Sequence, residues 1–300
     1  MSALQEIQST ISDLSQRVAP AVVRIEGGWR GASGVVVAAG RIVTNAHNVR
    51  DEAVNITFHD GRTAQGTLAG VDADGDLAVI TVDTGAVEPI EWMAGDGLTL
   101  GRPVFALSAS SQGSRITFGL VSSVARAFRG PRGRRISGSI EHTAQMARGS
   151  SGSALVDEQG RLVGLNTNRV GGGFYLALPA DGTLRSRVEL LAQGGSAERP
   201  QLGVGIASGH AARRMRRAVG LPERDGLLVR DVQEGSPAAR AAIAEGDLLV
   251  SAGGRPLAGV DDLYDVLGTV DAAGQLELVI VRGSEERTVS VDLTPAAARS

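Results

Sequence analysis

Short apolar runs separated by glycine-containing turns extend along most of this 300-residue chain, and they restrict its fold more than any other feature. One example is the apolar run over 35–37, which is followed by the tight turn Ala38-Ala39-Gly40 and by residues 41–44, whose centre is Ile42-Val43. This pattern of strand, turn and strand predicts a β-hairpin. Apolar residues make up 42% of the chain but aromatic residues only 3%, so its cores must be aliphatic. The 41 glycines suit many tight turns. We therefore predict a mostly β protein of about two domains.

Three reactive side chains lie beside such runs in the order His47, Asp76, Ser151. A serine hydroxyl attacks an amide carbonyl at neutral pH only if a base removes its proton, and imidazole suits that task. A buried carboxylate can fix the imidazole tautomer and stabilise the imidazolium that forms. Loops at strand ends are where a rigid β scaffold holds catalytic groups. The three residues are therefore candidates for a nucleophilic triad.

The turn around Ser151 reads Gly149-Ser150-Ser151-Gly152. Glycines here let the backbone turn sharply and aim successive N–H groups at a developing oxyanion. Taken alone, such a run is more typical of a flexible turn than of a nucleophile. Asp72 and Asp74 also compete with Asp76 for the role of the acid, although both have an alternative interpretation as turn residues.

Several spaced motifs in a fixed order are more specific than any one of them. In chain order they are GASGVVVAAGRIVTNAHNV, GVDADGDLAVI, FGLVSSVARA, RGSSGSALVDEQGRLVGLNT, GFYLALPA and VQEGSPAARAAIAEGDLLVSAGG. With these motifs the chain resembles the HtrA/Deg serine proteases from about residue 18 to its end. The resemblance implies a mostly β fold, in which a trypsin-like double β-barrel is followed by a smaller α+β PDZ domain.

The resemblance also implies roles at the matching positions. His47 would be the general base, Asp76 the orienting acid and Ser151 the nucleophile, with the N–H groups of Gly149 and Ser151 as the oxyanion hole. Asp76 is preferred as the acid because the family's acid stands directly before a Leu-Ala-Val strand. The implied function is an ATP-independent serine endopeptidase that cleaves unfolded or misfolded proteins, as in protein quality control and the stress response. No metal or other cofactor is implied, because triad chemistry requires none.

Three positions beside these residues depart from the family's motifs. The family's Gly-Asn-Ser-Gly-Gly has serine here at positions 150 and 153, and its Thr-Asn-Ala-His-Val ends here in Asn48. Asn48 puts a polar group beside the base, and Ser153 replaces a glycine, which costs little only if its φ is negative. These departures keep an alternative open: a catalytically weak or inactive PDZ-bearing chaperone or adaptor.

By resemblance, the specificity pocket is shaped by Gln145, Met146, Asn166 and Arg169. No aspartate stands in these segments to hold a substrate Arg or Lys. Gln145 and Met146 suggest a medium-sized, uncharged pocket that favours aliphatic residues before the cut, and Arg169 narrows it.

In a PDZ domain, an extended peptide adds to a sheet edge beside a helix, and N–H groups of a glycine-containing loop hold its C-terminal carboxylate. By resemblance, Leu202, Gly203 and Val204 form that loop and strand, and Leu263 and Leu267 lie on the helix that closes the groove. The alternative for these two leucines is the buried core. C-terminal peptides are thus expected partners, and their binding is expected to regulate the protease.

Four segments follow from the pattern: a helix over residues 1–18, a protease domain over 19–192, a linker over 193–200 and a PDZ domain over 201–296. The helix has one apolar stripe, because its apolar residues recur at steps of three and four. The members of this stripe are Leu4, Ile7, Ile11, Leu14 and Val18. The stripe either packs on its own barrel, which we favour, or joins copies of the chain, since the resemblance implies a homo-oligomer, most commonly a trimer.

Composition excludes several other functions. The net charge of −3 gives no reason to expect a nucleic-acid partner, and the absence of cysteine excludes disulfides and thiol catalysis. No apolar run approaches the roughly 20 residues that span a bilayer. The N-terminus has neither a basic start nor an apolar run. The expected location is the cytoplasm for the chain as written, or an extracytoplasmic space such as the periplasm if a leader is missing.

Overall fold

A computed structural model describes residues 2–26, 31–93, 97–130, 135–195, 200–207, 209–218, 220–222, 224–270 and 274–294. The chain divides into two compact units, Met1–Ala197 and Glu198–Ser300, and each is described by itself. Half of the predicted linker over 193–200, residues 196–199, lies outside the described residues.

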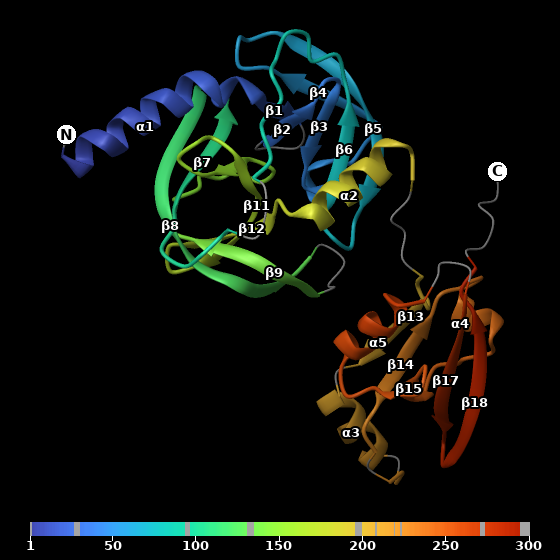
Figure 1. Cartoon of the computed structure of the whole chain (residues 1–300). Helices are drawn as coiled ribbons and strands as arrows, with labels where there is room; N and C mark the ends of the chain where they lie inside the picture. The colour runs from blue at the N-terminus through green and yellow to red at the C-terminus, as the bar shows by residue number, and fades with distance from the viewer. Residues whose placement is uncertain are drawn as a thin grey trace. The chain divides into compact units, whose positions relative to one another are not determined.

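The first unit contains two six-stranded closed barrels (Figure 1). The first barrel has the strand order β1-β2-β3-β6-β5-β4, with β1 (Val22–Glu26), β2 (Ala32–Ala38), β3 (Arg41–Thr44), β4 (Ala53–Thr57), β5 (Thr63–Asp72) and β6 (Leu77–Thr81). The second has the order β10-β11-β12-β9-β8-β7, with β7 (Pro103–Ser110), β8 (Gly113–Arg129), β9 (Arg135–His142), β10 (Ala154–Val156), β11 (Leu162–Gly171) and β12 (Phe174–Pro179). The predicted hairpin is β2–β3, in which Val35 pairs with Val43. The predicted double β-barrel is confirmed.

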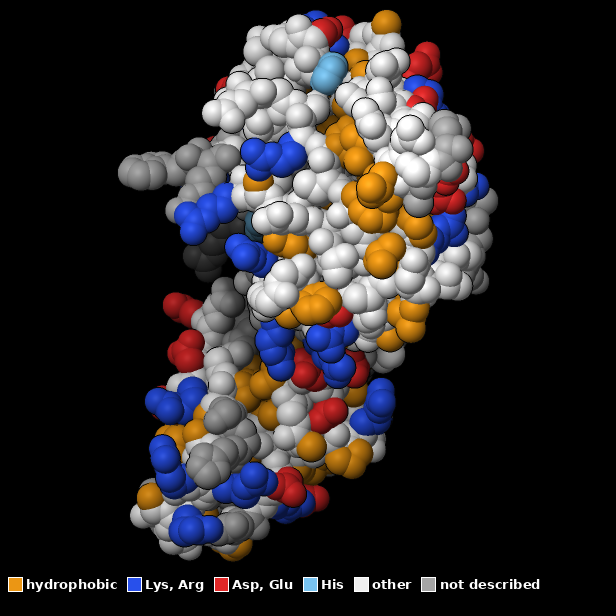
Figure 2. Space-filling model, turned by 90° about the vertical axis from the view of Figure 1, so that its left-hand side faces the viewer, with side chains coloured by type: hydrophobic (Ala, Val, Ile, Leu, Met, Phe, Trp, Pro, Cys, Tyr) orange, Lys and Arg blue, Asp and Glu red, His pale blue; other side chains and the backbone are white. Residues whose placement is uncertain are grey.

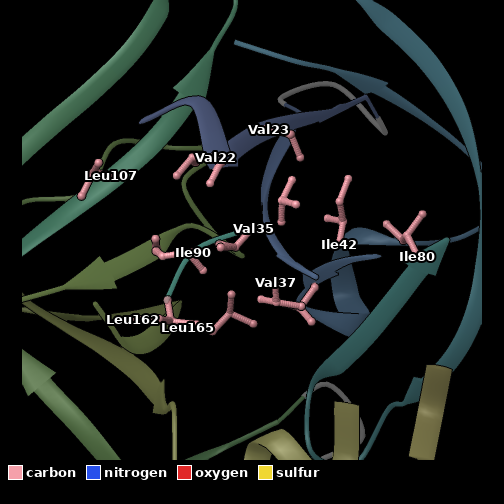
Figure 3. Close-up of a cluster of buried hydrophobic side chains, with 14 of the residues drawn as sticks. Val22, Val23, Val35, Val37, Ile42, Ile80, Ile90, Leu107, Leu162 and Leu165 are labelled. Carbon is pink, nitrogen blue, oxygen red and sulfur yellow. The ribbon is translucent and has the colours of Figure 1, made fainter. Parts of the chain in front are cut away.

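The two barrels share one aliphatic core. Figure 3 shows Val35 of β2 between Ile42 and Ile80 of the first barrel and Leu107 and Leu162 of the second, and all five are buried. Burial of branched aliphatic side chains supplies about 1.5–3 kcal/mol per residue, so a shared core resists separation of the barrels. This packing fixes the barrel edges against each other, and the candidate triad lies at those edges.

Helix α1 (Ala3–Arg17) begins with Ser2, whose hydroxyl accepts a hydrogen bond from the Gln5 N–H in a capping box. Its apolar stripe is only partly used within the chain. Leu14 and Val18 are buried in the shared core and Ile11 packs against it, whereas Leu4 is 78% exposed. The C-terminal half of the stripe therefore packs on its own unit, and the N-terminal half faces outward.

Helix α2 (Gly182–Ala192) packs on the first barrel. Its approach is close: a Cβ at Gly70 of β5 would lie 2.5 Å from the carbonyl oxygen of Leu191, so only glycine fits there. An ion pair between Arg187 and the buried carboxylate of Asp72 ties α2 to the end of β5. The segment that bears Asp76 begins directly after this ion pair.

The second unit is a sheet flanked by helices, as predicted for the smaller α+β domain. The order is β13-β14-β15-β17-β18, and β16 pairs with β15. The elements are β13 (Val204–Ala207), α3 (Gly209–Ala218), β14 (Leu227–Val232), α4 (Pro237–Arg240), β15 (Leu248–Ala252), β16 (Arg255–Pro256), α5 (Val260–Leu267), β17 (Gln275–Arg282) and β18 (Glu285–Asp292). Strand β13 lies at one edge of this sheet. In neither unit do the described helices include one both long and apolar enough to cross a bilayer.

Candidate active site

The structure brings His47 and Asp76 into direct contact. His47 lies on a short 3-10 turn (Ala46–Asn48) after β3, and Asp76 stands in the turn before β6. The His47 Nδ1 atom lies 2.9 and 3.0 Å from the two Asp76 carboxylate oxygens, and the His47 backbone N–H donates to Oδ1 at 3.2 Å. The carboxylate thus fixes the imidazole with the proton on Nδ1, which leaves Nε2 as the acceptor.

Asp76 is held in an unusual backbone conformation. Its φ is 53°, which is uncommon for a residue with a Cβ, and the side-chain amide of Asn45 donates to its carbonyl oxygen at 3.1 Å. The carboxylate is almost completely buried, and the Thr167 hydroxyl donates to its Oδ2 at 2.7 Å. Thr167 belongs to β11 of the second barrel, so this bond crosses between the barrels. Sequence reasoning did not connect Thr167 with the triad; it only expected the segment from Asn166 to Val170, which contains Thr167, to shape the specificity pocket.

The competing acids Asp72 and Asp74 have other partners. Asp72 accepts the Gly75 N–H at 2.8 Å and forms the ion pair with Arg187. Asp74 also has an interaction partner. The carboxylate in contact with His47 is that of Asp76.

Ser151 stands in a turn between two glycines with positive φ, 85° at Gly149 and 80° at Gly152. A side chain at position 152 would be strained and would also clash, because a Cβ there would lie 2.2 Å from both the Ser33 carbonyl oxygen and the Thr44 Oγ1. The Ser151 Oγ donates to the carbonyl oxygen of Thr167 at 2.8 Å. Between the described side chains of Ser151 and His47 there is no hydrogen bond.

The backbone N–H groups of this turn fall into two groups. Those of Ser150, Gly152 and Ser153 donate to carbonyl oxygens of Ala147, Asn166 and Ser150, respectively. Those of Gly149 and Ser151 have no partner among the described residues. The two unpaired N–H groups belong to the residues predicted to form the oxyanion hole.

The predicted pocket residues have different surroundings. Gln145 is exposed, while Met146 packs against a small buried cluster of the second barrel. Arg169 is exposed, and its guanidinium lies 5.9 Å from the centre of the Tyr175 ring. Asn166 is fully buried, and its amide donates to Ser153 Oγ at 2.9 Å and to the Ala154 carbonyl oxygen at 3.2 Å.

Asn166 also accepts from His142, a buried histidine that the sequence did not single out. The His142 Nε2 donates to Asn166 Oδ1 at 3.0 Å, and the buried Nδ1 has no partner among the described residues. Burial lowers the pKa of His142 from 6.5 to about 4, although the Asn166 bond and the nearby Glu141 carboxylate partly oppose this. His142 is therefore neutral at pH 7.

In the second unit, the predicted groove residues lie at the edge strand and in the core. Gly203 has a φ of 76°, and the N–H groups of Leu202 and Gly203 have no partner among the described residues. Val204 begins the edge strand β13. The side chains of Leu202, Leu263 and Leu267 are buried in the core of this unit.

Comparisons with known proteins agree with this architecture. A family model for a trypsin-like peptidase domain matches residues 32–165, and one for a PDZ domain matches residues 200–293. The putative serine protease HhoA of Synechocystis is 30% identical over 296 residues, which cover 91% of this chain and 72% of that protein. Protease Do-like 1, chloroplastic, of Arabidopsis thaliana is 28% identical over 277 residues, 85% of this chain. The chain spans only 61% of the length of that second relative.

Among solved structures, the HtrA-type protease AlgW with a decapeptide matches with a TM-score of 0.73 at 22% identity. The match covers 94% of this chain and 98% of that one, so the two share the fold of both units. The sequence match to HhoA extends over both domains in the same order. The chain belongs to the HtrA/Deg family of trypsin-like serine proteases with a C-terminal PDZ domain.

Proposed function

We propose that this chain is an ATP-independent serine endopeptidase that cleaves unfolded or misfolded proteins through an acyl-enzyme, with Ser151 as nucleophile, His47 as general base and Asp76 as orienting acid. The observation that supports this most is the contact of His47 Nδ1 with both carboxylate oxygens of the buried Asp76. The turn at Ser151 adds two N–H groups that have no partner among the described residues. Family membership supports the reaction class.

In this mechanism, the Ser151 oxygen attacks the scissile carbonyl while its proton passes to His47 Nε2. The N–H groups of Gly149 and Ser151 donate to the oxyanion that develops, and Asp76 stabilises the imidazolium. His47 then gives its proton to the leaving amine, and water hydrolyses the acyl-enzyme by the same route in reverse. The ester bond between Ser151 and the acyl group forms in the acylation step and is broken in the hydrolysis step, so the enzyme is regenerated.

The contact between Ser151 Oγ and the Thr167 carbonyl oxygen is a resting arrangement in this proposal. Proton transfer to His47 requires the Ser151 side chain to rotate away from that carbonyl. In this proposal the rotation to another staggered conformer exchanges the bond to Thr167 for one to His47 Nε2.

We propose that Gln145 and Met146 line a medium-sized substrate pocket with uncharged side chains, that Arg169 narrows it, and that Asn166 acts behind it. The exposure of Gln145 and Arg169 supports contact with substrate, whereas the buried amide of Asn166 is engaged with Ser153, Ala154 and His142. Cleavage is expected after medium-sized aliphatic residues. A peptide library that shows cleavage mainly after Arg or Lys would contradict this.

For the PDZ domain, we propose that a C-terminal peptide adds to the edge strand β13. Two observations support it: the N–H groups of Leu202 and Gly203 have no partner within the described ranges, and Val204 lies at that edge. AlgW, which has the same fold, was solved with a decapeptide. Leu263 and Leu267 are core residues in this arrangement. They hold the helix that flanks the groove, α5, against the core of the domain.

Self-association is a further part of the proposal, with a trimer as the expected state. Hydrophobic side chains gather on the face of the first unit that α1 and β8 line (Figure 2). Exposed apolar residues on these two elements include Leu4, Phe118, Leu120 and Val124. Light scattering after gel filtration tests this, and a monomer at all concentrations would refute it.

The location of the protein is tested by fractionation of the cells that make it. This experiment distinguishes the cytoplasm from an extracytoplasmic space.

The central experiment is turnover of casein by the wild type and Ser151→Ala, with and without a peptide that has a hydrophobic C-terminus. Cleavage that is lost in Ser151→Ala is the expected result, and acceleration by the peptide would support regulation through the PDZ domain. If neither protein cleaves casein while the peptide still binds, the PDZ-bearing chaperone or adaptor becomes the better description. Besides the departures from the family's motifs, the Ser151–Thr167 contact is an observation in its favour.

A further inference from the structure

Asn48 follows the candidate base in sequence, and its side chain reaches the nucleophile turn. The Asn48 Nδ2 donates to the carbonyl oxygen of Ser151 at 3.0 Å and to Thr44 Oγ1 at 3.0 Å. One side chain therefore connects the short turn that bears His47 to the turn that bears Ser151, across 103 positions of sequence.

The chemistry of its two partners fixes which way the Asn48 amide points. The Ser151 carbonyl oxygen can only accept. The Thr44 hydroxyl already donates its proton to the Ser33 carbonyl oxygen at 2.7 Å, so towards Asn48 it too can only accept. The NH₂ group must face both, and the arrangement cannot be satisfied by an acceptor in its place.

The peptide unit between Ser151 and Gly152 is bound at both ends. Its carbonyl oxygen accepts from Asn48 and also from the Ser33 N–H at 3.0 Å, while its N–H donates to the Asn166 carbonyl oxygen at 2.7 Å. The missing side chain of Gly152 lets this unit lie against Ser33 and Thr44. A peptide plane held from both sides fixes the position of the Ser151 Cα and so limits where the Ser151 side chain and N–H can point.

We infer that Asn48 is a positioning residue, which sets the distance and orientation of the Ser151 turn relative to His47. This inference rests on the proposed function. In the resemblance drawn from the sequence, a valine usually stands at this position, and valine has no donor for the Ser151 carbonyl oxygen. The polar group that Asn48 places beside the base thus forms a direct link between the turn that bears His47 and the turn that bears Ser151.

Asn48→Val tests the link, because it removes both donated bonds with little change in volume. The expected result is a fall of kcat of about tenfold with KM within twofold of the wild type, since small errors in the geometry of reacting groups lower the rate of the chemical step. Asn48→Asp keeps the shape but turns a carboxylate oxygen towards two acceptors, so its kcat is expected to fall further.

The matched control is Thr84→Val. Thr84 is buried in the first barrel and its hydroxyl accepts from the Gly40 N–H at 3.0 Å, so this variant also removes a buried side-chain bond to the backbone. It is expected to lower the stability to a similar extent and to leave kcat unchanged. A merely structural role for Asn48 would make the two variants alike in kcat, and that result would overturn the inference.

Hydrogen exchange gives a readout that does not depend on activity. Mass spectrometry of peptides covering residues 149–153 is expected to show faster amide exchange in Asn48→Val than in the wild type or Thr84→Val, at equal global stability. Unchanged exchange in Asn48→Val would overturn the inference even if the wild type cleaves casein and the proposed function therefore holds. If the wild type cleaves nothing, the proposed function fails, and faster exchange in Asn48→Val would still support the positioning of the turn.

Discussion

Acid is expected to destabilise this protein through one buried histidine. His142 ends β9, and its ring stacks on Tyr175 at 6.0 Å between centres. The Asn166 amide donates to Ser153 and Ala154, so its oxygen must face His142, and the histidine proton must lie on Nε2. A second proton would have to enter at Nδ1, which is buried and has no acceptor in the part of the chain that the structure describes. This is the physical reason that burial lowers the pKa of His142 to about 4.

The sign and size of the effect follow from the two states. In the unfolded chain the histidine takes up a proton near pH 6.5, whereas in the folded chain it does so near pH 4. The stability that the neutral ring contributes is complete above about pH 6.5 and is lost as the pH falls towards 4, because the unfolded state binds more protons in that range. Since one pKa unit corresponds to about 1.4 kcal/mol, the loss amounts to about 3 kcal/mol.

Urea unfolding between pH 7.5 and 4.5 measures this for the wild type and His142→Gln, whose side chain is neutral throughout. The wild type is expected to lose more stability than the variant over this range, by up to about 3 kcal/mol. Ile140→Val is the matched control, because it weakens the same strand by about 1 kcal/mol without a titrating group. Parallel pH curves for wild type and His142→Gln would refute the reasoning.

Two further variants test contacts at the ends of the Asp76 segment. Thr167→Val removes the hydroxyl that donates to the buried Asp76 carboxylate. Because a hydrogen bond to a charged group is worth about 1.5–3 kcal/mol, steady-state kinetics should show kcat falling about ten- to a hundredfold. Arg187→Met leaves the Asp72 carboxylate buried without its cation and should lower the unfolding free energy by about 3 kcal/mol, part of which the double variant with Asp72→Asn should restore. Full activity in the first variant, or wild-type stability in the second, would contradict these assignments.

The local features of the fold could be predicted from the sequence, because each depends on neighbouring residues. Apolar runs and a glycine turn define the hairpin β2–β3, and Gly149 and Gly152 mark the turn at Ser151. The place of His47 just after a strand could be predicted in the same way. The contact of His47 with Asp76 could be expected only through the resemblance, since three aspartates stand within five residues.

Contacts that depend on closure of the barrels could not be predicted. Thr167 lies 91 positions from Asp76, and Arg187 lies 115 positions from Asp72, so no periodicity relates them. Leu263 and Leu267 illustrate a second limit. Spacing of four residues places both on one face of a helix but does not tell whether that face borders a groove or a core. The structure places both in the core.

Ser153 provides a test of whether the departures from the family weaken this site. Among the described residues, the non-glycine residues with positive φ are Asp76 and Ala242, so Ser153 has an ordinary backbone conformation. Its hydroxyl is fully buried and accepts from the Asn166 amide at 2.9 Å. The serine therefore replaces glycine without strain and adds a bond to the residue that holds His142.

Ser153→Gly, which restores the family's residue, is accordingly expected to destabilise the protein. The lost bond and the greater freedom of glycine in the unfolded chain together amount to about 1–2 kcal/mol. Urea unfolding at pH 7.5 measures the change, and Ser137→Gly, an exposed strand position in β9 whose side chain has no partner among the described residues, controls for the effect of glycine alone. A variant as stable as the wild type would mean that the hydroxyl adds nothing. A stability loss beyond the control would instead show that the Ser153 hydroxyl stabilises the site, so that this departure from the family, like the one at Asn48, adds bonds beside Ser151.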